Sequence, residues 1–375
     1  MPDYALYIHW PFCLAKCPYC DFNSHVFRGT DETSWRYAYK AEMEFYKKHF
    51  DIGHIATIFF GGGTPSLMSP KLVNDILQDA EKIFGFATHI EISLEANPTS
   101  AEAQKFKDYR DAGITRLSMG IQALNDPDLK RLGRTHDSAE AIKAFEIAKT
   151  YFDNLSFDLI YARQNQTVSE WEKELKQAAD LAVDHISLYQ LTIEQDTPFA
   201  AWYKRGKISI PDDETAEEMY FLTSRVLEDQ GYDHYEISNF ARQSKECQHN
   251  KRYWMYKPYI GIGPGAHGRI LDKNQMVATI IEKDPKIYLQ HVLKTEKPAF
   301  TTREPLSYAE MDLEYILMGL RINDGINIAS PKEMKLNEGK ISDFCKSGHL
   351  FRDHYHLSAT RFGRPILNHI ISEII

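Results

Sequence analysis

The chain has 375 residues, of which 43% are hydrophobic and 26% are charged, so it can bury a sizeable core and form more than one domain. Its formal net charge of −9 argues against nucleic acid as a partner, because phosphate backbones attract basic proteins. Five cysteines are too few for a disulfide scaffold, and neither a signal peptide nor a membrane span is visible, so we expect a cytoplasmic protein.

Short apolar segments alternate with amphipathic helical patterns through the first half of the chain. The expected strands are 4–9, 55–60, 89–94, 115–121, 155–160 and 185–191. The expected helices are 33–49, 70–84, 100–111, 138–151 and 169–182. Thr99 with Glu102, and Ser169 with Glu172, have the spacing of capping boxes. This alternation predicts consecutive βαβ units around a parallel sheet, either open or wound into a barrel.

Polar and glycine-rich motifs follow the first four expected strands. CPYCDF comes after the first strand, GGGTPS after the second, EANP at the end of the third and GIQ at the end of the fourth. In β/α barrels the functional groups lie at the carboxyl ends of the strands. The four motifs are therefore expected to share one site.

The pattern changes after about residue 200. A helix is expected at 213–230, a glycine-rich turn at 261–268, and a new helical block from 305, opened by a capping box of Ser307 and Glu310. The last 30 residues indicate a strand pair and a helix. We predict an α/β fold, a partial (β/α)6 barrel with a small C-terminal α+β domain. The domains would be a core at 1–200, an extension at 201–304 that holds the sequence HNKRYW, and a C-terminal domain at 305–375.

Cys13, Cys17 and Cys20 form a C-x3-C-x2-C array directly after the first expected strand. A structural zinc site usually has four protein ligands, and only His9, His25 or a distant residue could be the fourth. Three thiolates suit a [4Fe–4S] cluster with one iron left open for a non-protein ligand, such as the amino and carboxylate groups of S-adenosylmethionine (SAM). Cys345 lies in the C-terminal domain and is expected to be simply buried.

Other polar residues lie at or near strand ends. Gly62 and Gly63 follow an apolar strand and would let the backbone approach a ligand closely, although a tight turn explains them equally well. A charged residue inside an apolar strand is expensive unless it is paired, which makes Asp158 informative. Glu95, Gln122 and Arg134 could each belong to an ordinary ion pair or hydrogen bond.

The cysteine array and the glycine loop together resemble the radical-SAM superfamily. The series IHWPFC, CPYCDF, GGGTPS, EANP, SMGIQ, RLGRTH, DLIY and GIGPGAHG is similar to the group that contains the oxygen-independent coproporphyrinogen III dehydrogenase (oxidase), and it spans nearly the whole chain. The segment 162–164 departs from the Gly-Leu-Pro turn usual in that group, which leaves the shape of this loop open. The resemblance implies SAM contacts at Tyr7, Tyr19, Gly62, Gly63, Thr64, Glu95, Gln122, Arg134 and Asp158.

Three features separate the dehydrogenase from the heme-chaperone branch of the same group. The dehydrogenase has a fourth cysteine where this chain has Phe22, and a long extension where only twelve residues precede Cys13. The chaperones carry an HNxxYW motif, here His249 to Trp254. All three features favour the chaperone branch, with heme as cargo. An imidazole is a good axial ligand for heme iron and aromatic rings suit a porphyrin face, although a histidine bonded to a backbone carbonyl would look the same.

The resemblance implies a heme chaperone that passes heme to acceptor proteins, some of them respiratory and at a membrane surface, and an electron donor for the cluster. Cys247 is a second candidate ligand for heme. The alternatives are radical decarboxylation of coproporphyrinogen III, a radical methyltransferase on the same scaffold, and a zinc-stabilised binding protein. Whether the chain is an enzyme is left open.

Overall fold

In the computed structural model, which describes residues 2–181 and 184–375, the first half of the chain builds one parallel sheet. Its strands lie side by side in chain order, and each pairs in parallel with the next. The expected βαβ series is confirmed. The strands are β1 (Tyr4–Trp10), β4 (Ile55–Gly62), β5 (Phe86–Ala96), β6 (Arg116–Gln122), β7 (Leu155–Tyr161) and β8 (His185–Gln190).

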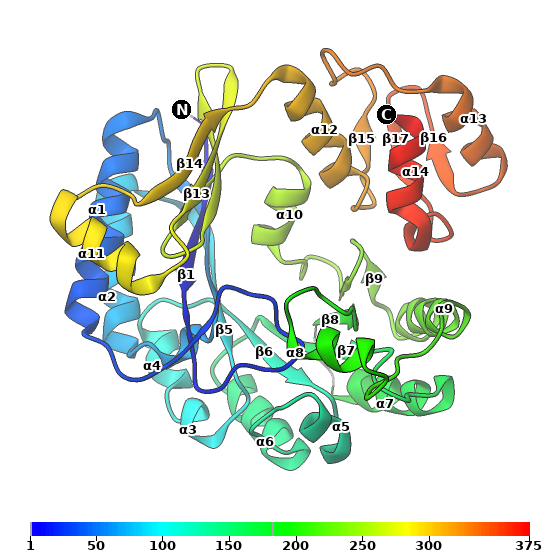
Figure 1. Ribbon diagram of the computed structural model, residues 1–375, viewed down its shortest axis with the longest axis horizontal. Helices are drawn as coiled ribbons and strands as arrows, with labels where there is room; N and C mark the ends of the chain where they lie inside the picture. Colours follow the sequence, from blue (N-terminus) through cyan, green and yellow to red (C-terminus); the bar gives the residue numbers. More distant parts are fainter. Residues whose placement is uncertain (1, 182–183) are drawn as a thin grey trace.

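Helices connect these strands and follow one another around the outside of the sheet (Figure 1). The expected helix 100–111 is broken in two at residues 104–105, and residue 182, the expected end of another helix, lies outside the described residues. The helices are α1 (Glu32–His49), α2 (Pro70–Phe84), α3 (Ser100–Ala103), α4 (Phe106–Asp111), α5 (Asp126–Arg131), α6 (Ser138–Lys149) and α7 (Val168–Asp180), with a 3-10 turn η1 (Pro65–Leu67).

The helix starts correct two of the predicted caps. Helix α7 begins with a capping box of Thr167 and Glu170, so the expected box of Ser169 with Glu172 is wrong. Thr99 does cap α3, but the carboxylate of Glu102 accepts from Asn97 N–H instead of closing the box. A helix starts where a side chain accepts from its first free N–H groups. Sequence spacing alone does not show which of two neighbouring hydroxyl side chains makes that hydrogen bond.

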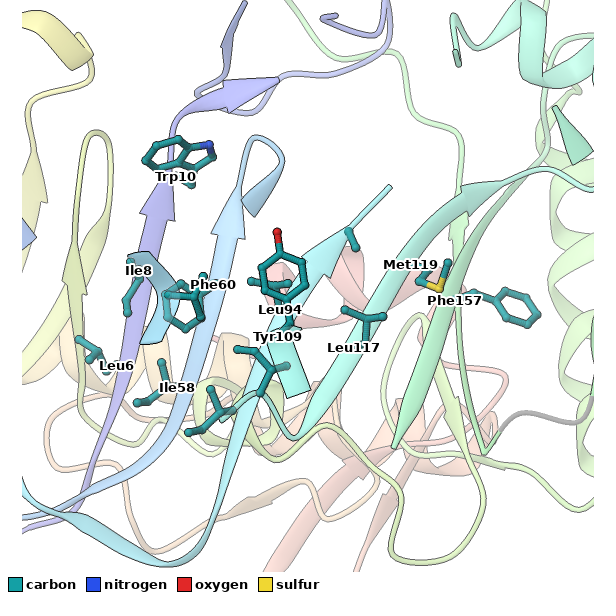
Figure 2. Packing of buried hydrophobic residues seen from close by; sticks show 14 of the residues in the cluster. Leu6, Ile8, Trp10, Ile58, Phe60, Leu94, Tyr109, Leu117, Met119 and Phe157 are labelled. Carbon is teal, nitrogen blue, oxygen red and sulfur yellow. The ribbon is translucent and has the colours of Figure 1, made fainter. Parts of the chain in front are cut away.

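The two faces of the parallel sheet differ sharply in polarity. Successive side chains of a strand point to opposite faces. Figure 2 shows one apolar face, on which the strand side chains meet Tyr109 of α4. This face carries Leu6, Ile8, Trp10, Ile58, Phe60, Leu94, Leu117, Met119 and Phe157. The intervening positions line cavities on the other face, among them Tyr7, Glu95, Ser118, Asp158 and Tyr189. The fold thus separates a packed core from a polar interior.

The later strands extend this sheet at both edges. In the described residues the sheet has twelve strands, with β14 and β9 at its open edges, which agrees with the expected partial barrel. Strand β11 pairs in parallel with β1 on the side opposite β4, and the other added strands are antiparallel. The added strands are β9 (Asp233–His234), β10 (Asn239–Ala241), β11 (Tyr259–Ile262), β12 (His267–Asp272), β13 (Gln275–Ile281) and β14 (Phe300–Pro305).

Four further helices and a small strand pair accompany this sheet. Helix α9 matches the helix expected at 213–230, and β2 pairs with β3 beside the cysteines. The helices are α8 (Pro198–Lys204), α9 (Asp213–Asp229), α10 (Gln248–Trp254) and α11 (Pro285–Thr295), and the pair is β2 (Phe12–Cys13) with β3 (His25–Val26).

The C-terminal segment has its own hydrophobic cluster and a three-stranded sheet, and Figure 1 shows it as an orange and red unit at one corner. The expected capping box of Ser307 and Glu310 and the final strand pair and helix are confirmed. The domain boundaries at 200 and 304 stay predictions. The elements are α12 (Tyr308–Gly319), β15 (Ile326–Asn327), α13 (Glu338–Lys346), β16 (Leu350–Arg352), β17 (His356–Ala359), η2 (Arg364–Ile366) and α14 (Leu367–Ile374). Within the described ranges, no helix is both long and apolar enough to cross a membrane.

Candidate functional site

The three clustered cysteines lie in the loop that follows β1, and all of them are free thiols. Cys20 N–H donates to Cys17 O at 3.1 Å, which closes a turn, and Phe27 N–H donates to Cys13 O at 2.8 Å. Helix α8 packs against the loop, because Phe199 N–H donates to Pro18 O at 3.0 Å. The loop is therefore held by hydrogen bonds from both sides.

The cysteines line a cavity of about 530 Å³ at the carboxyl ends of the parallel strands. All the predicted residues except Tyr7 and His249 meet in this one cavity. They are Cys13, Cys17, Tyr19, Cys20, Gly62, Gly63, Thr64, Glu95, Gln122, Arg134 and Asp158. Asn97, Ser118, Gly120 and Tyr189 line it too. These four were not singled out from the sequence, although the position of Asn97, Gly120 and Tyr189 at or near strand ends was a usable signal.

The donor set fits an iron–sulfur cluster better than a zinc ion. Nowhere in residues 2–181 and 184–375 do three His, Cys, Asp or Glu side chains come close enough to hold one metal ion. In a four-iron cluster each thiolate binds a different iron, so the sulfurs need not converge on a point. His9 is not available as a fourth zinc ligand, because Tyr7 OH lies 3.0 Å from its Nδ1 and Asn23 O lies 2.9 Å from its Nε2.

Two carboxyl groups with raised pKa values, Glu95 and Asp158, lie in the cavity. Burial and the nearby Asp158 raise the pKa of Glu95 from 4.5 to about 8. Burial likewise raises the pKa of Asp158 to about 6, although Ser187 and Arg116 oppose the shift. Ser118 Oγ donates to Asp158 at 3.3 Å. A ligand with positive charge would stabilise both carboxylates, and SAM carries a sulfonium and an ammonium group, so the floor fits SAM.

Gly62 and Gly63 are required by contacts within the protein. Gly62 has φ +109°, and a Cβ there would lie 2.6 Å from the ring of His9. A Cβ on Gly63 would lie 2.6 Å from Phe12 O, and Gly63 N–H donates to Trp10 O at 2.7 Å. The glycines thus let the end of β4 pack against the cysteine loop. That close packing accounts for them without a ligand.

A second cavity of about 200 Å³ lies beside the first and shares Glu95, Ser118, Asp158 and Tyr189 with it. Its other wall includes Tyr7, Phe59, Arg116, Ser187, His249, Asn250 and Tyr253. Tyr7 and His249, which do not reach the first cavity, therefore stand next to its floor. The motif HNKRYW, far away in sequence, belongs to the same polar interior.

His249 is completely buried in this arrangement. Its Nδ1 lies 2.9 Å from Thr57 Oγ1 and its Nε2 lies 2.7 Å from Tyr253 OH. The N–H groups of Gln248 and His249, at the start of α10, donate to Glu91, and Cys247 is also completely buried. Both ring nitrogens of His249 are occupied by side-chain hydroxyls. Neither nitrogen faces an open surface.

Comparison with known proteins identifies the family. The model described as "Radical SAM superfamily" matches residues 7–178. The heme chaperone HemW of Haemophilus influenzae is 41% identical over 298 residues, which cover 77% of this chain and 76% of that protein. The chain belongs to the HemW family of radical-SAM proteins.

Two further likenesses extend along the whole chain. The mitochondrial radical S-adenosyl methionine domain-containing protein 1 of Bos taurus is 33% identical over 385 residues, covering 99% of this chain and 87% of that protein. The structure described as coproporphyrinogen III oxidase (HemN) from Escherichia coli has a TM-score of 0.82, covers 99% of this chain and 89% of its own, and is 23% identical. That structure confirms the fold. Membership of the radical-SAM superfamily implies a [4Fe–4S] cluster and SAM, which the cavity fits.

The segment after Asp158, where the chain departs from the expected Gly-Leu-Pro turn, has a defined structure. Ala162 adopts φ +52°, and the buried guanidinium of Arg163 donates to Asp128 at 2.8 Å and also to Glu174. These carboxylates come from α5 and α7. In this member of the HemW family, an ion-pair network thus fixes the loop that the sequence left open.

Proposed function

We propose that this protein is a heme chaperone, which retains a cluster and SAM in the large cavity and binds heme for transfer to acceptor proteins. The observation that carries the proposal is the 41% identity with the heme chaperone of Haemophilus influenzae over 298 residues. Phe22 supports it, because it is 61% exposed at the cavity where the dehydrogenase branch would have a fourth cysteine.

In this proposal Cys13, Cys17 and Cys20 hold the cluster, and the remaining residues of the cavity hold SAM. Glu95 and Asp158 would face its positive groups, and Arg134 would face its carboxylate. When bound, the cluster and SAM supply one-electron cleavage of a carbon–sulfur bond. The protein's own part is to bind and orient SAM and to exclude water from the floor.

Heme is proposed to bind at the HNKRYW motif, with His249 as an iron ligand. Since both nitrogens of His249 are bonded and its ring is buried, ligation requires α10 to leave its present position. Tyr253 and Trp254 would then offer flat apolar area to the porphyrin. Cys247, also buried, would be uncovered by the same movement.

The proposed partners follow from this role. They are heme, acceptor proteins that include respiratory proteins at a membrane surface, and an electron donor for the cluster. The proposed location is the cytoplasm. No nucleic acid is expected, in line with the net charge of −9.

Anaerobic reconstitution followed by heme titration tests the proposal. We expect a heme-dependent Soret band, and at least tenfold weaker heme binding in His249→Ala, about 1.4 kcal/mol. His234→Ala is the matched control, because His234 is also buried and bonded, through Nε2 to Ile237 O at 3.0 Å.

The same sample can be assayed for SAM cleavage and for decarboxylation of coproporphyrinogen III. Turnover to protoporphyrinogen without heme binding would replace the proposal by the dehydrogenase. Equal heme affinity in the wild type and His249→Ala would remove His249 as the ligand.

A further inference from the structure

Arg134 is a cation in the cavity wall that is held in a single orientation. Its Nη2 donates to Asn97 Oδ1 at 2.6 Å and to Gly120 O at 2.8 Å. The preceding Gly133 lies against the cysteine loop, since a Cβ there would come within 2.6 Å of Pro18 Cδ. The loop that carries the guanidinium is therefore packed directly on the segment between Cys17 and Tyr19.

The Nη1 nitrogen of this guanidinium lies beside a sulfur atom. Arg134 Nη1 donates to Cys17 Sγ at 3.6 Å. Its Nε is buried and has no hydrogen-bond partner. A buried cation is costly unless an anion compensates it. As a ligand of the cluster, Cys17 would present a thiolate sulfur beside this guanidinium.

We infer that Arg134 raises the reduction potential of the cluster through this charged hydrogen bond to the sulfur of Cys17. One-electron reduction makes the cluster and its thiolates more negative by one charge. A fixed positive charge beside a ligand sulfur stabilises the reduced form more than the oxidised form. Hydrogen bonds to the sulfurs are among the factors that set such potentials, and charged ones are the strongest.

This role is separate from the contact with SAM proposed for Arg134 above. The contact with SAM would be made to the carboxylate of the nucleotide, whereas the bond from Nη1 goes to a ligand sulfur of the cluster and involves no atom of SAM. Arg134 would be a positioning residue that acts on the cluster through its ligand.

The test is a redox titration of the reconstituted full chain without SAM, followed by EPR of the reduced cluster. In Arg134→Gln we expect the midpoint to fall by at least 59 mV, which is a tenfold change in a one-electron equilibrium. Arg134→Lys keeps the charge but loses the planar donor, so the midpoint potential of this variant should fall less. Arg131→Gln is the matched control, since Arg131 lies on α5 and pairs with Asp128 at 2.9 Å. The cluster of this variant should have the same midpoint potential as the cluster of the wild type.

A wild-type potential in Arg134→Gln with full iron and sulfide content would overturn the inference. If Arg134→Gln does not take up four irons, the test uses Asn97→Asp instead. A carboxylate beside Nη2 would offset the positive charge of Arg134 while leaving its hydrogen bond to Cys17 in place. The potential of Asn97→Asp should also fall, and an unchanged value would overturn the inference. Heme plays no part in this titration, so its outcome is independent of the proposed chaperone function.

Discussion

At the scale of single residues, most buried polar groups of this protein find partners from distant segments, and Glu42 does so only in part. It is completely buried on α1, accepts from Tyr288 OH at 2.7 Å and from Gly263 N–H at 2.8 Å, and leaves Oε1 without a partner. Burial raises its pKa from 4.5 to about 7, and the two hydrogen bonds oppose the shift. The folded protein thus prefers the protonated carboxyl.

This preference makes the stability depend on pH. Because the unfolded chain releases the proton at a lower pH than the folded chain, stability falls as pH rises from about 4.5 to about 7. The full loss is about 3 kcal/mol. Glu42→Gln should remove this loss, so its unfolding free energy should exceed that of the wild type at pH 8 by more than at pH 5, as measured by urea unfolding.

The control for this prediction is Glu44→Gln, an exposed carboxylate on the same helix that pairs with Lys40. It should follow the pH profile of the wild type. An identical profile for Glu42→Gln and the wild type would mean that Glu42 stays charged in the fold. Tyr288, which donates to Glu42, lies on α11. The sequence of α1 alone therefore does not reveal the energetic cost of burying Glu42.

At the scale of the elements, α7 shows how a helix start is chosen. Thr167 accepts from Glu170 N–H at 3.2 Å, and the carboxylate of Glu170 accepts from Thr167 N–H at 2.8 Å. Ser169 and Glu172 have the same spacing, but they lie inside α7, where the N–H groups begin to bond within the helix. The two pairs differ only in their position relative to the first turn.

Alanine substitutions at Thr167 and Ser169 distinguish the observed start of α7 from the start predicted from the sequence. Thr167→Ala should cost about 1 kcal/mol, because it leaves an N–H of the first turn without its acceptor. Ser169→Ala should be neutral or slightly stabilising, since alanine favours the helix interior. Thermal or urea unfolding of the two variants measures the difference. A larger loss in Ser169→Ala would restore the start predicted from the sequence.

At the scale of the whole molecule, the C-terminal hydrophobic cluster meets the rest of the chain through both polar and aromatic contacts. Glu314 on α12 pairs with Arg269 on β12 at 2.7 Å, and Glu236 forms an isolated bridge with Ile322. Arg364, which is 8% exposed, donates to His234 O at 3.0 Å. Specific polar bonds therefore help to attach the C-terminal unit to the rest of the chain.

Removing one of these bonds should loosen this attachment. Arg364→Ala is expected to speed amide hydrogen exchange in 305–375 several-fold, because it leaves the buried carbonyl of His234 without its donor. Exchange in β1, β4 and β5 should not change. Arg361→Ala is the control, since Arg361 is exposed and its guanidinium lies over the ring of Phe362. Faster exchange throughout the sheet would show instead that the two units unfold together.

Much of the candidate site could be predicted from the sequence. The order of the strands and the motifs at their ends placed Cys13, Gly63, Glu95 and Gln122 at one edge of a parallel sheet, and the structure gathers them in one cavity. This works because carboxyl ends of neighbouring parallel strands meet, whatever the intervening helices are. Family motifs added the cluster, SAM and heme.

The position of His249 could not be predicted in this way. Its motif lies on the short helix α10, and its place beside the first cavity depends on β11 pairing with β1, across about 250 residues of chain. No local pattern specifies such a long-range pairing. The hydroxyls of Thr57 and Tyr253 on its two nitrogens are likewise a result of packing.

The sequence by itself determined the parallel sheet, the cysteine loop and the chemical class of the cofactors, because strand alternation and ligand spacing are local properties of the chain. Only the tertiary structure decided which groups face one another. It placed the guanidinium of Arg134 beside the sulfur of Cys17 and gave both ring nitrogens of His249 a hydrogen-bond partner. It also left one carboxylate oxygen of the buried Glu42 without a hydrogen-bond partner. These contacts join residues far apart in the chain, and the folded packing alone fixes their distances.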